Sequence, residues 1–201
     1  FKILGLNMNS KILDVAAGTG RTSIPLALKG YRVTALDLTD AMMEVMKKKS
    51  IEIGLKNLEM VSANAKNMPF EDSSFDAIVS FRFLHLFSHD EKQEIIDEAH
   101  RVIKPNGRVI FEFNNDGMIG RNLLGLLSKY RGKGLNSAVS RAEINDLYKH
   151  YEIEKIQGFG LPLTGSISKK IPKLASSLIK ISTRNIFNSI CRMSWVISKK
   201  K

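Results

Sequence analysis

The chain has 201 residues, a formal net charge of +11 at pH 7 and one cysteine. This length suits one α/β domain with a sizeable core, and a single cysteine excludes a disulfide framework and suits a reducing cytosol. Because no uncharged apolar run reaches the length of a membrane span and no signal peptide is visible, we expect a cytoplasmic protein.

The positive charge is concentrated in the C-terminal part of the chain. Residues 1–116 hold 15 Lys and Arg against 16 Asp and Glu, whereas residues 117–201 hold 16 against 4. From Gly158 onward there is no acidic residue. This asymmetry predicts an anionic partner for the C-terminal part, which could be a substrate, a lipid surface or a nucleic acid.

A glycine-containing turn, DVAAGTG at residues 14–20, separates a predicted buried strand (KILDVA) from a predicted helix. Pro25 falls in the first turn of that helix, where its missing N–H costs nothing. The turn then presents backbone N–H groups and a positive helix end at the carboxyl edge of a parallel sheet. Gly18 and Gly20 let the backbone approach a nucleotide-like ligand, although such a turn also occurs for tight packing alone.

Asp37 ends the next apolar strand, RVTALD. In dinucleotide-binding folds an acidic residue about 20 positions beyond the glycine turn binds the ribose hydroxyls. The alternative is that Asp37 caps the following helix, but Thr39 and Asp40 are available for capping. We therefore expect Asp37 to bind a ribose.

The following elements alternate between helix and strand, as in a doubly wound sheet. A helix is predicted over residues 39–54, strands over 58–63 and 75–81, a helix after the capping box formed by Ser88 and Glu91, and a strand over 107–113. The residues KPNG at 104–107 predict a turn between that helix and that strand.

Several side chains are predicted to lie at the carboxyl edge of this sheet, each with two interpretations. Asn64 could bond an adenine edge or stabilise its own turn. Met42 could contact a base or fill the core. His85 is a candidate catalytic group or a packing residue among phenylalanines and leucines. Asp116 could be a base or a helix cap.

The C-terminal third is predicted to contain a helical segment at 117–149, with a capping box at Ser140 and Glu143, and two further strands, YEIEKIQGF and RMSWVISKKK. Between the strands, an amphipathic helix beginning near Pro172 is predicted. That helix could pack on the sheet with solvated lysines, or residues 166–201 could contact an anionic membrane peripherally. Nucleic-acid binding is disfavoured because no aromatic side chains are interleaved with the charges.

Together these motifs resemble the class I S-adenosylmethionine-dependent methyltransferases of the small-molecule branch, and are similar to ubiquinone and menaquinone methyltransferases. The matching segments are LDVAAGTG, VTALDLTDAMM, SANAKNMPFEDSSFDAIVSFRFLH and EAHRVIKPNGRVIFEF. The resemblance implies a doubly wound, mostly parallel, seven-stranded α/β sheet of the Rossmann-like type. It also implies a helical insertion before strand six and an antiparallel last strand between the fifth and sixth. We expect one domain over 1–201, with a cofactor core at 10–114 and a basic substrate-side cap with the last two strands at 115–201.

The resemblance also implies roles for individual residues toward S-adenosyl-L-methionine. The turn would hold its methionine end, Asp37 its ribose, and the remaining residues its adenine and methionine side. The implied cofactor-binding set is Asp14, Ala16, Gly18, Thr19, Gly20, Asp37, Leu38, Met42, Asn64, Ala65, Ser80 and Phe81. Ala16 and Asn106 stand where the family usually has glycine, Asn64 replaces an acid, and most of the family's N-terminal helix is missing.

The predicted function is in-line transfer of a methyl group from S-adenosyl-L-methionine to a small-molecule or lipid-like acceptor, a reaction that depends mainly on positioning. A general base, for which His85 and Asp116 are candidates, is needed only if the acceptor keeps its proton at neutral pH. No metal site is expected. The alternatives are a nicotinamide-dependent oxidoreductase, although Ser23 stands where its third glycine belongs, and a methyltransferase-fold binding module without turnover.

Overall fold

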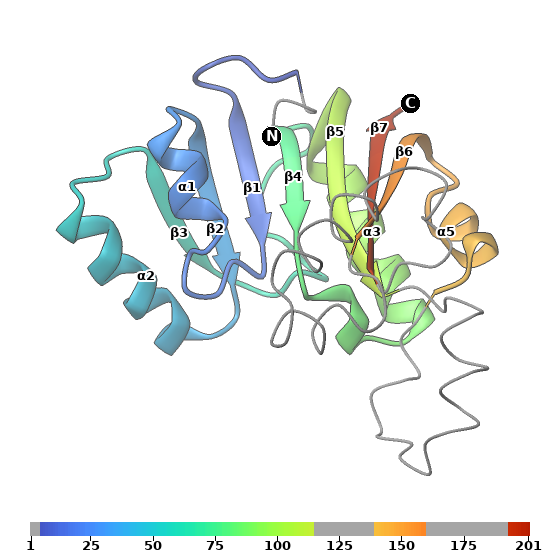
Figure 1. Cartoon of the computed structure of the whole chain (residues 1–201), viewed down its shortest axis with the longest axis horizontal. Helices are drawn as coiled ribbons and strands as arrows, with labels where there is room; N and C mark the ends of the chain where they lie inside the picture. Colours follow the sequence, from blue (N-terminus) through green and yellow to red (C-terminus); the bar gives the residue numbers. More distant parts are fainter. Residues whose placement is uncertain (1–4, 115–138, 160–192) are drawn as a thin grey trace, which may run out of the picture.

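A seven-stranded sheet organises the computed structural model, which describes residues 5–114, 139–159 and 193–201 (Figure 1). Its strand order is β3-β2-β1-β4-β5-β7-β6. Neighbouring strands from β3 to β5 are parallel, and β7 is antiparallel to both of its neighbours, β5 and β6. This confirms the predicted fold class and the predicted place of the last strand. The strands are β1 Lys11–Val15, β2 Arg32–Asp37, β3 Leu58–Ser62, β4 Phe75–Ser80, β5 Ile103–Asn114, β6 Tyr151–Phe159 and β7 Met193–Lys200.

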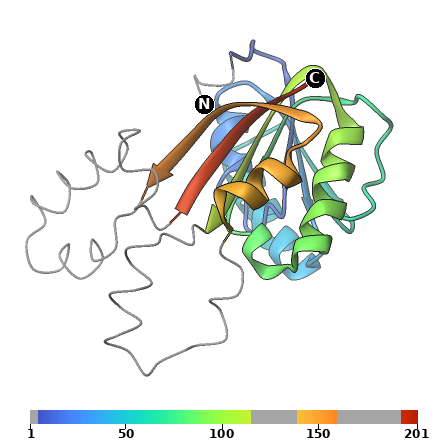
Figure 2. The same cartoon turned by 90° about the vertical axis from the view of Figure 1, so that its right-hand side faces the viewer.

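Helices cover the two faces of the sheet, because the central strands are apolar on both sides. On one face, Ile12, Ala77 and Ile110 pack with Leu26 of helix α1 (Ser23–Leu28), and helix α2 (Asp40–Glu52) packs beside it through Met43 and Met46. On the other face lie helices α3 (His89–Val102) and α5 (Arg141–Leu147), which Figure 2 shows next to each other. Between β4 and α3, residues Leu84–Leu86 form a short 3-10 turn, η2.

Both predicted capping boxes are present. The Ser88 hydroxyl accepts a hydrogen bond from the Glu91 N–H at the start of α3, and Ser140 does the same with Glu143 at the start of α5. In each box the glutamate side chain accepts a bond in return from the serine N–H, so that two otherwise unpaired donors are satisfied. The start of α5 is thereby defined by the local sequence alone.

The predicted turn at 104–107 is instead part of strand β5. Phe75 pairs with Ile103, and the register then shifts so that Ala77 pairs with Arg108. Asn106 adopts a left-handed backbone (φ 63°), which a short polar side chain tolerates. Residues 104–107 therefore form an irregularity within β5, because β5 pairs with β4 both before and after them.

The described part of the predicted membrane-facing stretch 166–201 is strand β7, at the centre of the sheet's C-terminal half. Lys200 Nζ donates hydrogen bonds to the carbonyls of His100 and Ile103, 2.7 and 3.1 Å away, so it binds the C-terminal end of α3. This lysine is internal to the fold. Asp116, the rest of the predicted insertion and the predicted amphipathic helix lie outside the described residues.

Candidate functional site

The turn between β1 and α1 lies at the sheet edge to which the arrowheads of β1 and β4 point (Figure 1). Ala16, Gly18 and Gly20 all have a left-handed backbone, with φ of 59°, 55° and 80°. The turn is anchored by the Ala17 N–H, which donates to the Leu36 carbonyl, and the Gly20 N–H, which donates to the Ala17 carbonyl, each over 3.0 Å. The first of these bonds joins the turn to the end of β2, and the second closes the turn on itself.

The two glycines of the turn serve different purposes. A Cβ placed on Gly18 would meet no atom within 4 Å, so this backbone faces open space. A Cβ on Gly20 would lie 2.7 Å from Met46 Cγ and 3.0 Å from Ile24 Cδ1. Gly18 therefore leaves room for a ligand, whereas Gly20, also predicted to face the ligand, allows α2 to pack closely against the turn.

This difference predicts losses of stability of different size for two alanine variants. Gly18→Ala should cost about 1 kcal/mol of stability, because of the left-handed backbone, and should weaken ligand binding at the turn. Gly20→Ala should cost roughly 2–4 kcal/mol, because its methyl group also collides with Met46. Thermal unfolding and cofactor titration of both variants measure this difference; equal losses of stability would contradict it.

Asp37, at the end of β2, ties the turn to the start of α2. Its Oδ2 accepts a hydrogen bond from the Gly18 N–H (2.7 Å) and its Oδ1 accepts one from the Thr39 N–H (2.9 Å). Thr39 is the N-cap residue of α2 but its side chain makes no capping bond, so the expected cap from Thr39 is not formed, and at this helix end Asp37 bonds only the N–H of Thr39 itself. A carboxylate has about four acceptor positions. One remains on each Asp37 oxygen, which fits a pair of adjacent ribose hydroxyls.

Asp14, which was expected at the methionine end of the cofactor, points into the protein. It is 2% exposed, and its Oδ2 accepts a hydrogen bond from the Ser23 hydroxyl of α1. Burial raises the pKa of Asp14 to about 7 against the opposing effect of the Ser23 bonds, with a further small increase from Asp37. Asp14 therefore supports the turn from beneath. No bond between Ser23 and Asp14 was predicted from the sequence, where Ser23 stood out only because it replaces the third glycine of a dinucleotide motif.

The residues predicted around the adenine lie next to Asp37. Leu38 and Met42 are 69% and 45% exposed, whereas Met43 is buried in the core. Ala65 is buried, and the Asn64 Oδ1 accepts a bond from the Lys66 N–H, so Asn64 does stabilise its own turn. Two exposed apolar side chains beside a carboxylate are a suitable surface for a flat base.

At the end of β4, the side chains of Ser80 and Phe81 have different surroundings. The Ser80 hydroxyl is buried and donates to the Val15 carbonyl over 2.8 Å, which ties β4 to the end of β1. Phe81 is half-buried, with its ring against Trp195. Next comes Arg82, with a left-handed backbone (φ 57°), and then His85 in η2, which is half-buried. Thr19, in the turn, is also half-buried.

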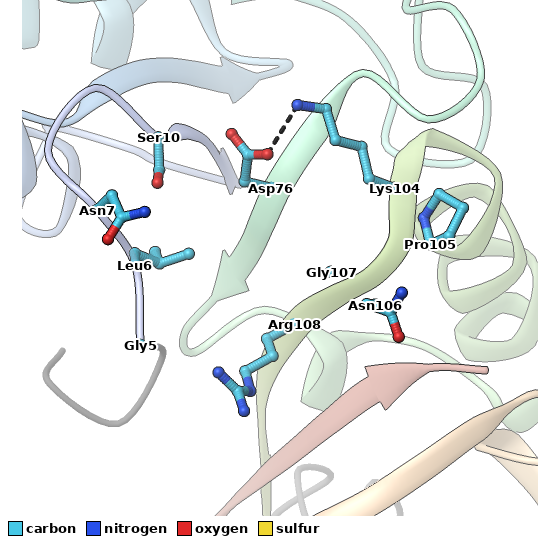
Figure 3. A pocket seen from close by; sticks show the side chains of 10 residues that line it. All are labelled: Gly5, Leu6, Asn7, Ser10, Asp76, Lys104, Pro105, Asn106, Gly107 and Arg108. Atoms are coloured by element: carbon cyan, nitrogen blue, oxygen red, sulfur yellow. Dashed lines mark hydrogen bonds and ion pairs between the residues drawn. The ribbon is translucent and has the colours of Figure 1, made fainter.

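Two cavities among the described residues lie away from this edge. One of about 250 Å³ is lined by the start of β5 and the residues before β1, and includes the ion pair of Lys104 with Asp76 (2.7 Å; Figure 3). The other, of about 570 Å³, is lined by Lys11, Arg32 and Lys56 near the beginnings of β1, β2 and β3. Both lie toward the amino ends of the strands, so neither is the site predicted at the carboxyl edge.

Within the described residues no cluster of three or more His, Cys, Asp or Glu side chains could hold a metal ion. In the same ranges, no helix is long and apolar enough to cross a membrane.

Comparisons with known proteins agree on one family. A family model described as a methyltransferase domain matches residues 12–107. The chain is 41% identical over 101 residues to a demethylmenaquinone methyltransferase of Clavibacter sepedonicus, covering 50% of this chain and 39% of that protein. It is 31% identical over 169 residues to the ubiquinone/menaquinone biosynthesis C-methyltransferase UbiE of Rickettsia bellii, covering 80% and 58%. The chain thus spans about half the length of these relatives.

The fold has close counterparts among solved structures. A SAM-dependent methyltransferase from Methanosarcina mazei superposes with a TM-score of 0.71 at 20% identity, covering 100% of this chain and 97% of that one. At this identity the likeness establishes the fold, and any functional assignment must come from the residues of the site.

Proposed function

We propose that this chain, whose residues 12–107 match a methyltransferase-domain family model, is a class I S-adenosylmethionine-dependent methyltransferase that transfers a methyl group from S-adenosylmethionine to a small aromatic acceptor. The observation that supports this proposal most strongly is the pairing of Gly18 with Asp37. One leaves open space over the backbone and the other has one acceptor position left on each oxygen. Together they fit an adenosyl group.

Each part of the cofactor has matching residues at this edge. Asp37 accepts hydrogen bonds from the ribose hydroxyls, and the exposed side chains of Leu38 and Met42 flank the adenine. Asn64 retains its amide N–H groups for the adenine edge, because its Oδ1 is used by the Lys66 N–H. The open backbone of the turn around Gly18 and Thr19 takes the methionine end. Asp14 and Ser80 hold this backbone in place from within the core.

The sulfonium of the cofactor supplies an activated methyl group. The protein then has to exclude water and align the acceptor behind that methyl group. Ser80 bonds the end of β1, and η2 with His85 follows shortly after it, which supports His85 as the group that takes a proton from an acceptor that must lose one. The names of the relatives concern quinone precursors, and we propose an acceptor of that kind, a hydroxylated aromatic ring.

A nicotinamide-dependent oxidoreductase is the weaker alternative. The third glycine of the dinucleotide motif brings helix and strand close together, and here Ser23 occupies that place and is fully buried on Asp14.

Calorimetric titration with S-adenosylhomocysteine, and separately with NAD, tests the proposal. We expect S-adenosylhomocysteine to bind in the micromolar range and NAD at least tenfold more weakly, because Ser23, bonded to Asp14, replaces the third glycine of the dinucleotide motif. A methyl-donor consumption assay with 1,4-dihydroxynaphthalene under nitrogen then tests turnover. Tighter binding of NAD would contradict the proposal, and cofactor binding without turnover on any dihydroxyaryl acceptor would favour a binding module.

A further inference from the structure

A row of three side chains crosses the sheet next to the proposed cofactor site. Ser80, the last residue of β4, pairs with Phe111 of β5, so Phe81 stands opposite Glu112. Glu112 in turn pairs with Trp195 of β7, which puts Phe81, Glu112 and Trp195 in one row. All three lie on the same face of the sheet as Val79, Ile110 and Ile197. Each of these residues is two positions away on the same strand, toward the edge of the sheet where β1 and β4 begin. On β1, Asp14 pairs with Val79, so Ala16 of the turn follows at the level of Phe81.

The carboxylate of Glu112 is unusual in this position. Glu112 is only 8% exposed, and its single hydrogen bond among the described residues comes from the Trp195 indole N–H, over 3.2 Å. The rings of Phe81 and Trp195 meet edge to face over the same strand, with centroids 5.5 Å apart. A buried carboxylate ordinarily has several donors, because its lost hydration must be replaced.

The geometry points to Glu112 as a binding residue for the methyl acceptor: its carboxylate accepts a hydrogen bond from a ring hydroxyl of an aromatic acceptor that rests against Phe81 and Trp195. This inference rests on the proposed function and specifies which protein group selects the acceptor. Trp195 holds the carboxylate with its indole N–H and leaves the other acceptor positions to the ligand. The aromatic rings supply the flat apolar surface that such sites require.

The site selects for a hydroxyl because a buried acceptor left without its donor is costly. An acceptor ring that carries methoxy groups in place of hydroxyls has the same shape but cannot donate. Glu112 would therefore discriminate between the two, and it would do so without contacting the cofactor. Its role is separable from that of Asp37, which lies on β2 beyond β1 in the sheet.

Calorimetry at saturating S-adenosylhomocysteine tests this with two probes, 1,4-dihydroxynaphthalene under nitrogen and 1,4-dimethoxynaphthalene. We expect the unmodified chain to bind the hydroxylated probe at least about tenfold more tightly, and Glu112→Gln to lose most of that preference, since hydrogen bonds to charged groups are the stronger ones. The cofactor affinity of the variant should stay unchanged. Glu152→Gln, at an exposed carboxylate of β6, is the matched control and should keep the preference.

The outcomes separate this inference from the proposed function. If S-adenosylhomocysteine does not bind at all, the proposed function fails. If it binds but the unmodified chain shows no preference, binds neither probe, or Glu112→Gln keeps the preference, the role of Glu112 is overturned. Should Glu112→Gln not fold, Trp195→Phe removes the donor that orients the carboxylate. An unchanged preference in that variant overturns the inference equally.

Discussion

Replacing Asp37 by alanine is expected to weaken S-adenosylhomocysteine binding by about 2–4 kcal/mol, which is roughly 30- to 1000-fold in the dissociation constant. The variant loses the proposed pair of bonds to the ribose hydroxyls. It also releases the Gly18 and Thr39 N–H groups, which the carboxylate holds over 2.7 and 2.9 Å, so the turn becomes less ordered before the cofactor binds. Calorimetric titration with S-adenosylhomocysteine measures the loss directly.

Two other variants separate these contributions. Asp37→Asn keeps one acceptor oxygen for the backbone and should lie between the unmodified chain and the alanine variant. Asp40→Ala removes an exposed carboxylate from the first turn of α2, where it accepts a bond from the Ser62 hydroxyl. It should change cofactor binding by less than about 0.5 kcal/mol, as surface substitutions usually do. An Asp37→Ala variant with unchanged affinity would exclude Asp37 from the site.

The second large effect concerns Asp14 and the pH dependence of stability. Burial raises the pKa of Asp14 from its ordinary value of 3.8 to about 7. Between these values the folded chain holds a proton that the unfolded chain has released, so this group's contribution to the free energy of unfolding falls as pH rises. The contribution is present below pH 3.8 and is lost by pH 7, and it amounts to about 4 kcal/mol in total.

Asp14→Asn isolates this contribution, since asparagine can still accept the hydrogen bond from Ser23. Urea unfolding at pH 4, 5.5, 7 and 8 should show the variant gaining stability relative to the unmodified chain by about 4 kcal/mol across the series. Ser23→Ala, which removes the donor but keeps the acid, should retain the pH dependence. A constant difference between Asp14→Asn and the unmodified chain would show that Asp14 ionises normally in the folded protein.

Among the described residues, local sequence was sufficient for the order and type of most elements. The capping boxes at Ser88 and Ser140 were predicted from two residues each, because the serine hydroxyl and the glutamate satisfy backbone donors within one helical turn. The place of β7 between β5 and β6 was implied by the resemblance to a known family and confirmed. The predicted turn at 104–107 lies within β5 as an irregularity, because pairing with β4 stops at Ile103, resumes at Arg108 and leaves the residues between them without a partner in β4.

The functions of individual polar residues were less predictable. Asp14 and Asp37 are both acids at the ends of neighbouring parallel strands, and the sequence suggested the same kind of ligand contact for each. In the fold Asp14 is only 2% exposed and accepts a hydrogen bond from the Ser23 hydroxyl, whereas Asp37 is half-buried at the turn. Strand alternation and the position of α1 decide which acid faces the core, and neither is visible in a short motif.

By itself, then, the sequence determined that a parallel sheet carries a glycine turn and an acidic strand end at one edge, because these depend on periodicity, turn residues and caps within a few positions of each other. Tertiary structure alone decided that Gly18 faces open space while Gly20 contacts Met46, and that Phe81, Glu112 and Trp195 form one row. Those arrangements join residues far apart in the chain, such as Glu112 and Trp195, which are 83 positions apart. They depend on strand register and helix packing, which no local propensity encodes.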